Sequence, residues 1–459
     1  MLSAVDVRTL EITDPSNGEA VGTVEIASDA EAAEAVARAL AAFPAWAATP
    51  PAERGLRLRA AAQALAARAG EVAAMNTRET GKSAADAAGG VEAAVNTLLQ
   101  YAELGPVHRG RRLNGAWDAV DVATPQPRGV VLALTPWNDP VAVAAGLLGA
   151  AIVSGDTVVH KPSERCPYTG ALLDEILAGA LPEGVLVHVT GDGATGAALA
   201  ASPDLAVIAH VGSTATGRKL ALVGAQHDVH VIRENGGNDP LVVDAGVDPV
   251  WAAGQAALGA FANAGQICTS VERIYVHREV AQPFLTALVA EADAWTRKSG
   301  QPLVDERMRA SVAAQVDAAV AAGAELLTGG AVPEGPGSHY PCTVLSQVPE
   351  GAEVLTEETF GPVAPVVVVD DFEEGLRLAA ADRYGLAATV LTPDMTHAHR
   401  AAALLPVGTV KVNAVFGGAP GGSAQPRGAS GAGFGYGPEL LDEMTTTTVV
   451  HFGLPGGRA

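Results

Sequence analysis

Hydrophobic and polar residues follow a helical period in the first hundred positions of the chain. Over residues 29–74, apolar residues recur three or four positions apart, and Thr49-Pro50-Pro51 and Gly70 interrupt them. A second stretch of this kind covers residues 92–104. This spacing puts the apolar side chains on one face of a helix, while proline and glycine mark helix ends. The pattern therefore predicts a series of helices.

From residue 129 onward, β-branched apolar runs alternate with helical stretches. The runs GVVLALTPWN, DTVVHKPS, VLVHVTG and HVIREN are typical of strands, and VAVAAGLLGAAIVSG and TGALLDEILAGA are typical of helices. Such alternation indicates βαβ units and a buried parallel sheet. A second series begins near Pro240 and ends with VKVNAV. We expect an α/β fold, with a doubly wound unit in the first half and a second α/β unit after it.

Two segments fit neither series. Residues 108–129 have the pattern of a polar β-hairpin, and TTTTVVHF near the C-terminus has that of a single strand. Because isolated hairpins are marginally stable and unpaired strands expose backbone groups, we expect the two segments to pair, within the chain or across a subunit boundary. The glycine-rich residues 417–437 lack a GxGxxG motif, and we expect them to form a mobile loop near a site.

Composition excludes several partners and compartments. The formal net charge is −22 over 459 residues, without an offsetting basic run, which disfavours nucleic acid and anionic membrane surfaces. Residues 1–30 lack an apolar core behind a basic start, and the apolar runs are too short to cross a bilayer. Three widely spaced cysteines without a CxxC pair fit a reducing compartment. We therefore expect a cytoplasmic protein.

Cys268 in GQICTS is the main candidate for a reactive group. A free cysteine is often a buried, inert apolar residue. Cys268, however, follows Gly265 and Gln266 at the end of an apolar helical run, where a thiol can face a cleft. Nucleophilic attack requires the thiolate, which needs nearby donors or a positive potential. Both a structural and a nucleophilic Cys268 stay open at this point.

Glu234 and Asn138 lie at the ends of strand-like runs. In RENGGNDP, Glu234 lies where carboxylates line the ligand crevice of α/β sheets, and a raised pKa would make it a general base. A solvated turn glutamate is the alternative. In TPWND, the amide of Asn138 can donate to a developing oxyanion, or Asn138 can be a turn residue.

Other strand ends suit a nucleotide. HVGSTATGRK predicts a strand, a turn of small residues and a helix whose free backbone N–H groups can bind phosphate. GDGATG (residues 191–196) matches GxGxxG after a strand, although a plain turn also explains it. In HKPSE, Lys161 and Glu164 can hydrogen-bond a ribose, or they can be two surface charges. The histidine pairs in HDVH and HAH lack a third ligand, so no metal site is expected.

Taken together and in this order, TPWN, HKPSE, GSTATG, ENGG, GQIC and EETFGP resemble the NAD(P)-dependent aldehyde dehydrogenase superfamily. The resemblance covers essentially the whole chain and ends with SGAGFGYGPE. It implies a Rossmann-like cofactor domain, an α/β catalytic domain and a small bridging β-sheet that assembles a homodimer or homotetramer. The implied boundaries are residues 1–108 and 126–235 for the cofactor domain, 236–430 for the catalytic domain, and 109–125 with 431–459 for the bridging segments.

The resemblance also implies a reaction and its residues. Cys268 would attack an aldehyde, Asn138 and the Cys268 backbone N–H would bind the oxyanion, and hydride transfer would leave a thioester. Glu234 would activate the water that hydrolyses this thioester to the carboxylic acid, whereas relatives that acylate coenzyme A generally lack such a glutamate. The residues implied for the cofactor are Thr135, Pro136, Trp137, Lys161, Glu164, Gly193, Gly212, Ser213, Thr214, Gly217, Glu358 and Phe360.

Three positions bear on specificity. Asp139 stands where many relatives carry an aromatic residue, which suggests a polar or cationic aldehyde. Glu164 accepts from a 2′-hydroxyl but repels a 2′-phosphate, so NAD is favoured over NADP, although Lys161 partly offsets the repulsion.

Two other functions stay open. The protein could be a coenzyme A-acylating or NADP-preferring semialdehyde dehydrogenase, or a cofactor-binding protein without turnover.

Overall fold

The alternating strands and helices after residue 129 form a six-stranded sheet. A computed structural model describes residues 8–417 and 423–453. Neighbouring strands of this sheet run parallel, except that β19 is antiparallel to β9. In spatial order the strands are β19 (Gly431–Ala432), β9 (His230–Glu234), β8 (Leu205–Val211), β5 (Val130–Leu134), β6 (Thr157–Lys161) and β7 (Leu186–His188).

Helices cover both faces of the six-stranded sheet, because its strands carry apolar side chains on both sides. Val131 and Ala133 join a core beneath the helices of one face. Leu132 and Leu134 join the core beneath the other. The first face holds α2 (Pro51–Ala67), α3 (Ala69–Thr80), α4 (Ala84–Leu104), α5 (Pro140–Ser154) and α6 (Pro167–Ala178), and the second holds α1 (Asp29–Ala47), α7 (Gly193–Ala200) and α8 (Thr214–His227).

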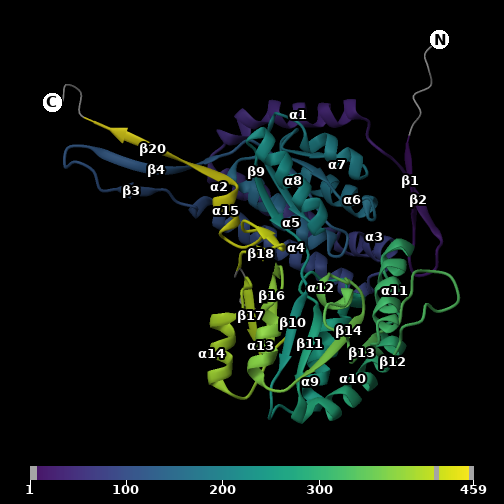
Figure 1. Ribbon diagram of the computed structural model, residues 1–459. Helices are drawn as coiled ribbons and strands as arrows, with labels where there is room; N and C mark the ends of the chain where they lie inside the picture. Colours follow the sequence, from purple (N-terminus) through teal and green to yellow (C-terminus); the bar gives the residue numbers. More distant parts are fainter. Residues whose placement is uncertain (1–7, 418–422, 454–459) are drawn as a thin grey trace.

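A second, seven-stranded sheet lies below the first in the view of Figure 1. Its strands are parallel apart from the edge strand β12, which is antiparallel to β13. In spatial order they are β12 (Glu325–Thr328), β13 (Thr343–Ser346), β14 (Val363–Val369), β11 (Val271–His277), β10 (Asp239–Val243), β16 (Ala387–Leu391) and β17 (Thr409–Val412). The two sheets confirm the predicted α/β class.

The helices of this second unit again lie on both sides of the sheet. On one face, α9 and α10 pack against β10 and β11, and on the other face α13 and α14 pack against β10 and β16. The bounds are α9 (Pro249–Phe261), α10 (Arg278–Ser299), α11 (Glu306–Ala321), α12 (Glu353–Thr356), α13 (Phe372–Ala380) and α14 (Met395–Leu404), with short helices η1 (Gly105–Val107), η2 (Ala262–Gly265) and α15 (Leu440–Glu443).

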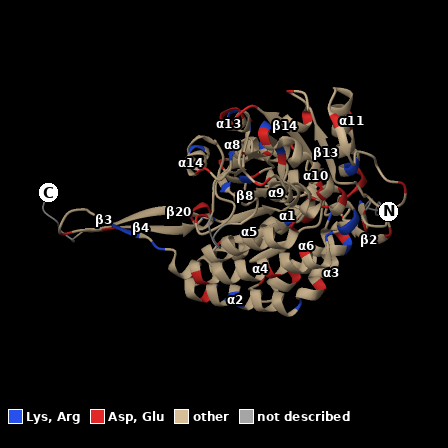
Figure 2. Cartoon of the chain, turned by 90° about the horizontal axis from the view of Figure 1, so that it is seen from below, with Lys and Arg blue, Asp and Glu red and all other residues tan. Residues whose placement is uncertain are grey.

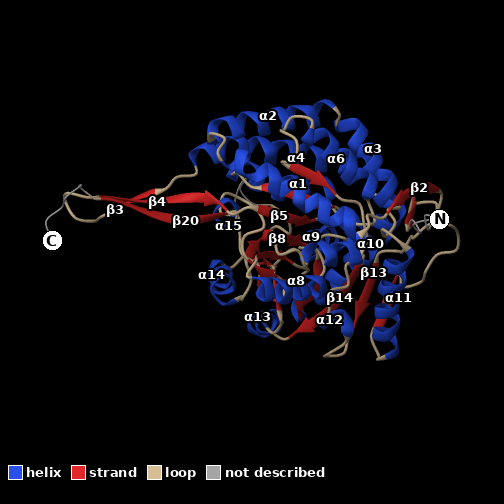
Figure 3. Cartoon of the chain, turned by 90° about the horizontal axis from the view of Figure 1, so that it is seen from above, coloured by secondary structure: helices blue, strands red, loops and turns tan. Residues whose placement is uncertain are grey.

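The two segments that fitted neither series form a three-stranded arm that projects from the rest of the molecule (Figures 1 and 3). β20 pairs antiparallel with β4 along its whole length, and β3 pairs with the other edge of β4. The predicted pairing is thus confirmed, and it occurs within one chain. The strands are β3 (Arg111–Leu113), β4 (Val120–Pro127) and β20 (Thr445–Phe452).

The remaining strands make two small sheets. β1 (Thr9–Thr13) pairs with β2 (Ala20–Glu25), and β15 (Tyr384–Gly385) pairs with β18 (Arg427–Gly428). Of the glycine-rich stretch predicted as a mobile loop, residues 418–422 lie outside the described residues, and the later part contains β18 and β19.

Residues of both charge signs occur along the outer helices α2 and α3, as the colours of Figure 2 show. Within residues 8–417 and 423–453, no helix combines the length and the apolar character that crossing a membrane requires.

Candidate active site

The predicted residues of the two units meet at a cavity of about 210 Å³. It lies where β5, β8 and β9 end in the first sheet and faces the loops before β11 and β14 of the second. Ligands bind at such carboxyl ends of α/β sheets. Of the predicted site residues, the cavity is lined by Pro136, Trp137, Asn138, Gly212, Ser213, Glu234, Cys268, Glu358 and Phe360, whereas Thr135, Lys161, Glu164, Gly193, Thr214 and Gly217 do not line it.

The backbone turn before Cys268 is strained. Asn263, Ala264 and Gly265 all have positive φ, at 52°, 54° and 73°. Left-handed backbone costs a residue other than glycine about 1–2 kcal/mol. A Cβ atom on Gly265 would also lie 2.1 Å from the carbonyl oxygen of Gly361, so close packing requires this glycine. The turn presents Cys268, which is exposed to the cavity.

Gln266 fixes this turn and connects it to the first sheet. Its Oε1 accepts from the backbone N–H of Val304 (2.9 Å), and its Nε2 donates to the carbonyl of Asn263 (3.0 Å). The Gln266 carbonyl accepts from Asn138 Nδ2 at 3.1 Å. Since an amide nitrogen carries two N–H groups, Asn138 keeps a second donor for an oxyanion. Lys82 Nζ holds the Asn138 carbonyl from the other side (3.0 Å).

The Cys268 thiol is protonated at neutral pH in this state. Its pKa is raised to about 12, first because surrounding protein atoms remove it from bulk water, although the residue itself is accessible through the cavity. The nearby carboxylates of Glu234, Asp239 and Glu358 raise the pKa further, and Lys411 lowers it. The thiol proton must therefore be removed before attack on a carbonyl.

Glu234 has the properties of a base for this cavity. Burial raises the pKa of its carboxyl to about 7, and a hydrogen bond from the Gly435 N–H to Oε1 (3.0 Å) partly opposes the shift. A Cβ atom on Gly435 would lie 2.0 Å from Cγ of Glu234. The glycine therefore lets the C-terminal segment approach the carboxylate and hold it. A carboxyl with this pKa exchanges protons readily near neutral pH.

A buried carboxylate that sequence analysis missed holds the Glu358 loop. Glu272, on β11, accepts from the backbone N–H groups of Thr359 (2.5 Å) and Phe360 (3.0 Å). Burial raises the pKa of Glu272 well above its ordinary value and that of Glu358 to about 7. The Phe360 ring meets the Trp137 ring edge to face at 5.5 Å. The signal for Glu272 was a single acid inside the apolar run VERIYVH.

Lys161 lies on the first sheet, apart from the cavity. It is buried, and its Nζ donates to the carbonyls of Pro162 (2.8 Å) and Gly191 (2.9 Å). Burial lowers the pKa of the ammonium. Glu164 follows it in a half-buried position, and Gly193 begins α7 in an exposed one. These groups form a polar region at the same edge of the sheet.

Three of the predicted cofactor residues are packed away from the cavity, and two of them have a structural contact. The Thr135 hydroxyl lies 2.8 Å from Nε2 of the buried His160. A Cβ atom on Gly217 would lie 2.0 Å from the Asn235 side-chain oxygen, so this glycine allows α8 to pack on the strand end. Thr214 is buried at the start of α8, and its hydroxyl has no hydrogen-bond partner among the described residues.

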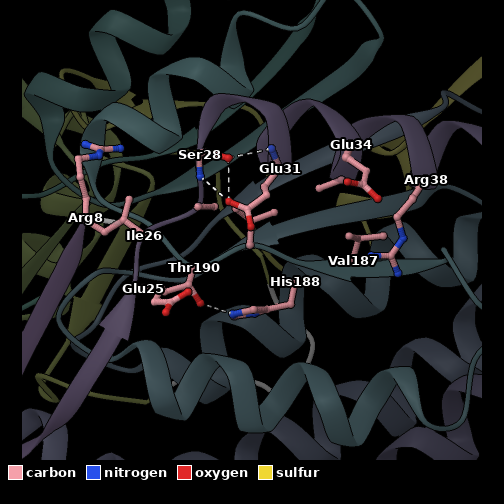
Figure 4. Close-up of a pocket in the computed structure, with 13 residues that line it drawn as sticks. Arg8, Glu25, Ile26, Ser28, Glu31, Glu34, Arg38, Val187, His188 and Thr190 are labelled. Carbon is pink, nitrogen blue, oxygen red and sulfur yellow. Dashed lines mark hydrogen bonds between the residues drawn. The ribbon is translucent and has the colours of Figure 1, made fainter. Parts of the chain in front are cut away.

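The larger cavity, of about 490 Å³, is a different place. It lies beside α1, the end of β2 and β7, as Figure 4 shows. Its walls include Arg8, Glu31, Arg38 and His188, and none of the predicted site residues. Its Ser28 and Glu31 already bond to each other at the start of α1. No cluster of three or more metal-binding side chains occurs within the described ranges.

Known proteins resemble this chain over nearly all of its length. A model of the aldehyde dehydrogenase family matches residues 2–450. An α-ketoglutarate semialdehyde dehydrogenase of Haloferax volcanii is 35% identical over 88% of this chain and 87% of its own. Among solved structures, an NAD-dependent aldehyde dehydrogenase of Sinorhizobium meliloti superposes with a TM-score of 0.94 at 32% identity, covering 99% and 94%. Betaine aldehyde dehydrogenase of Staphylococcus aureus, in complex with NAD⁺, gives 0.93 at 26% identity, covering 97% and 91%.

Proposed function

The chain belongs to the aldehyde dehydrogenase family, and from this premise we propose that Cys268, Asn138 and Glu234 carry out its reaction. The enzyme oxidises an aldehyde with NAD as coenzyme. The observation that supports these three residues is their placement around one cavity, together with the turn of Gly212 and Ser213 that suits a dinucleotide. NAD, when bound there, supplies the acceptor for hydride.

In the first step, the Cys268 sulfur forms a bond to the aldehyde carbon. The thiol proton leaves to solvent through the cavity, to which Cys268 is exposed, so Glu234 enters the second step as a free carboxylate. The negative charge that develops on the carbonyl oxygen meets the Asn138 amide and the Cys268 backbone N–H. Fixed donors of this kind stabilise the transition state because they need no reorientation.

In the second step, loss of hydride from the former aldehyde carbon leaves a thioester on Cys268. Glu234 then removes a proton from a water molecule, whose oxygen adds to the thioester carbonyl. The carbon–sulfur bond breaks, the carboxylic acid leaves, and the thiol is restored. The Glu234 carboxylate, which the Gly435 N–H holds in the same cavity, can activate water. Its position therefore supports water, and not coenzyme A, as the acyl acceptor.

The coenzyme fits the residues at the strand ends. Ser213 caps α8 by accepting from the Thr216 N–H (3.3 Å), so the helix begins at the cavity wall with free backbone donors in its first turn. Glu358 and Phe360 lie on the opposite wall, where we place the nicotinamide ribose. Lys161 and Glu164 are assigned to the adenosine ribose, and Glu164 favours NAD over NADP because it would repel a 2′-phosphate.

The structure changes the expectation for Asp139. Its Oδ1 lies 3.1 Å from Nζ of the buried Lys82, and the residue does not line the cavity. Since the ion pair compensates its charge, Asp139 is a weak basis for selecting a cationic aldehyde. We infer that Asp139 sets no preference between carboxylate-bearing, cationic and neutral aldehydes.

Turnover is the direct test of the proposed reaction. We expect NADH absorbance to rise when the enzyme receives NAD and an aldehyde from a panel of aliphatic, aromatic, amino and carboxylate-bearing compounds. Product formation should be independent of coenzyme A, because water is the acyl acceptor. A requirement for coenzyme A, with an acyl-coenzyme A product, would contradict the hydrolytic step.

We propose that the arm assembles a homodimer or homotetramer. β20 is an edge strand, and apolar Val449 and Phe452 on it are 59% and 61% exposed. A long exposed edge with apolar side chains is typical of a surface that pairs with another chain.

We also propose the domain boundaries that the sequence predicts. A cytoplasmic location is proposed as well, and the three free cysteines support it.

Charge on the arm should dissociate the assembly. The double substitution Val449→Asp and Phe452→Asp places two carboxylates where apolar side chains would be buried, so we expect a monomer in light scattering coupled to gel filtration. Leu56→Asp, at a 66% exposed position on α2, is the matched control and should leave the mass unchanged. Retention of the parent mass by the double variant would exclude the arm as the interface.

A further inference from the structure

Arg165 is a cation in the cavity wall to which the reaction above assigns no role. Arg165 is the residue next to Glu164 in the loop after β6, and it lines the cavity together with Cys268 and Glu234. Its guanidinium carbon lies 5.2 Å from the centre of the Trp137 ring. Among the described residues that line this cavity, Arg165 is the one cationic side chain.

A dinucleotide brings two negative charges on its diphosphate into this cavity. The acidic side chains of the wall, Glu234 and Glu358, offer no compensation, and the Gly212–Ser213 turn offers only partial charges of backbone N–H groups. Lys161 already donates to two backbone carbonyls. The guanidinium of Arg165 is therefore the group whose charge and planar donors match a diphosphate.

Asp305 holds Arg165 from the second unit. Arg165 Nε lies 2.8 Å from Asp305 Oδ2, and Nη2 donates to Oδ1 at 3.5 Å. The buried Nε–H is not aligned with the carboxylate and has no acceptor among the described residues. Asp305 also begins α11 by accepting from the Met308 N–H (2.8 Å), and Met308 and Ser311 of this helix line the cavity. The ion pair thus crosses from the first sheet to the opposite wall.

We propose that Arg165 binds the diphosphate of the coenzyme and that Asp305 is a positioning residue, which orients the guanidinium across the cavity. The buried, unaligned Nε–H is the second observation in favour, because buried donors normally find an acceptor. The proposal adds a ligand to the NAD site on which the proposed function rests. Arg165 would contact the charged diphosphate directly, and Asp305 would affect coenzyme binding only by orienting Arg165.

Binding measured without turnover tests the proposal. Isothermal titration calorimetry of the full chain with NAD, ADP and adenosine should show that Arg165→Gln weakens NAD and ADP about 10- to 100-fold, the usual effect of losing a hydrogen bond to a charged group. Adenosine, which has no phosphate, should bind as before. Arg165→Lys should recover part of the loss. Asp305→Asn keeps the guanidinium but loosens its orientation, so it should weaken NAD and ADP less than Arg165→Gln does and should leave adenosine binding unchanged.

Two outcomes would overturn the proposal. In the first, Arg165→Gln binds NAD and ADP like the parent. In the second, Arg165→Gln and Asp305→Asn weaken NAD, ADP and adenosine equally, as expected of a contact that only joins the two units. Arg278→Gln and Asp370→Asn, which break an exposed ion pair elsewhere (3.1 Å), are the matched controls. Because no aldehyde is present, failure here leaves the roles of Cys268 and Glu234 untouched, and a Cys268→Ala variant should titrate like the parent.

Discussion

Replacing Cys268 by alanine is expected to lower kcat/KM for aldehyde oxidation by at least about 10⁴-fold, the size of effect seen when an enzyme loses its nucleophile. Without the sulfur, no covalent adduct forms, and neither Asn138 nor Glu234 has an intermediate to act on. NAD binding should be unchanged. The measurement is the steady-state rate of NADH formation, with calorimetric titration of NAD on the same preparation.

The chain offers its own control for this substitution. Cys342 is buried in the core between α10 and β13, outside the residues that line the cavity. Cys342→Ala should keep full activity and should still be inactivated by an alkylating reagent, whereas Cys268→Ala should resist alkylation in the cavity. Appreciable turnover by Cys268→Ala would mean that another group forms the adduct.

Glu234→Gln is expected to separate the two halves of the reaction. Hydride transfer requires only the adduct on Cys268, so one equivalent of NADH per active site should appear in a rapid burst. Hydrolysis then lacks its base, and steady-state turnover should fall by about 10²- to 10⁴-fold. Stopped-flow absorbance gives the burst, and mass spectrometry should find the acyl group on Cys268. A variant without a burst would assign Glu234 to the first step, as the acceptor of the thiol proton.

The same residue sets an expected pH dependence. Burial raises the pKa of Glu234 to about 7, and only its carboxylate form accepts a proton. The hydrolysis rate should therefore rise with pH through about 7 and level off above it. The Cys268 pKa of about 12 adds no fall on the alkaline side, because the thiolate fraction also grows with pH. In Glu234→Gln, the inflection near 7 should disappear from the residual rate.

A substitution that leaves Glu234 in place but moves it should give an intermediate result. Gly435→Ala would put a Cβ atom 2.0 Å from Cγ of Glu234, so the carboxylate must shift away from the Gly435 N–H. Slower hydrolysis with an intact burst is the expected result. An unchanged steady-state rate would show that the contact does not position the base.

Strand ends are the part of the site that sequence could predict. The carboxyl ends of parallel strands gather at one edge of a sheet, and Asn138, after β5, and Glu234, the last residue of β9, both line the cavity there. Cys268 needed its motif, because a lone cysteine in an apolar run is more often structural. The pairing of the hairpin with the terminal strand followed from the need to satisfy backbone groups on strand edges.

Contacts between distant segments could not be predicted from the sequence. Arg165 and Asp305 are 140 positions apart, and no local sequence pattern around either residue indicates that the two form an ion pair. The same holds for Lys82, which compensates Asp139 and so changes its meaning for specificity. For Gly217, the sequence motif predicted a contact with the cofactor. The structure adds a packing contact with Asn235 that the motif did not indicate.

The strained turn at residues 263–265 has a consequence for how the protein matures. Left-handed backbone at consecutive positions is a conformation that the isolated segment would avoid. The turn is held by groups from far along the chain, among them Asn138 and Val304. During synthesis, therefore, the thiol reaches its place beside the oxyanion donor only after both sheets have docked. A nascent or misassembled chain carries a cysteine without the oxyanion donor and the base beside it, so catalysis at this position is a property that only the completed fold acquires.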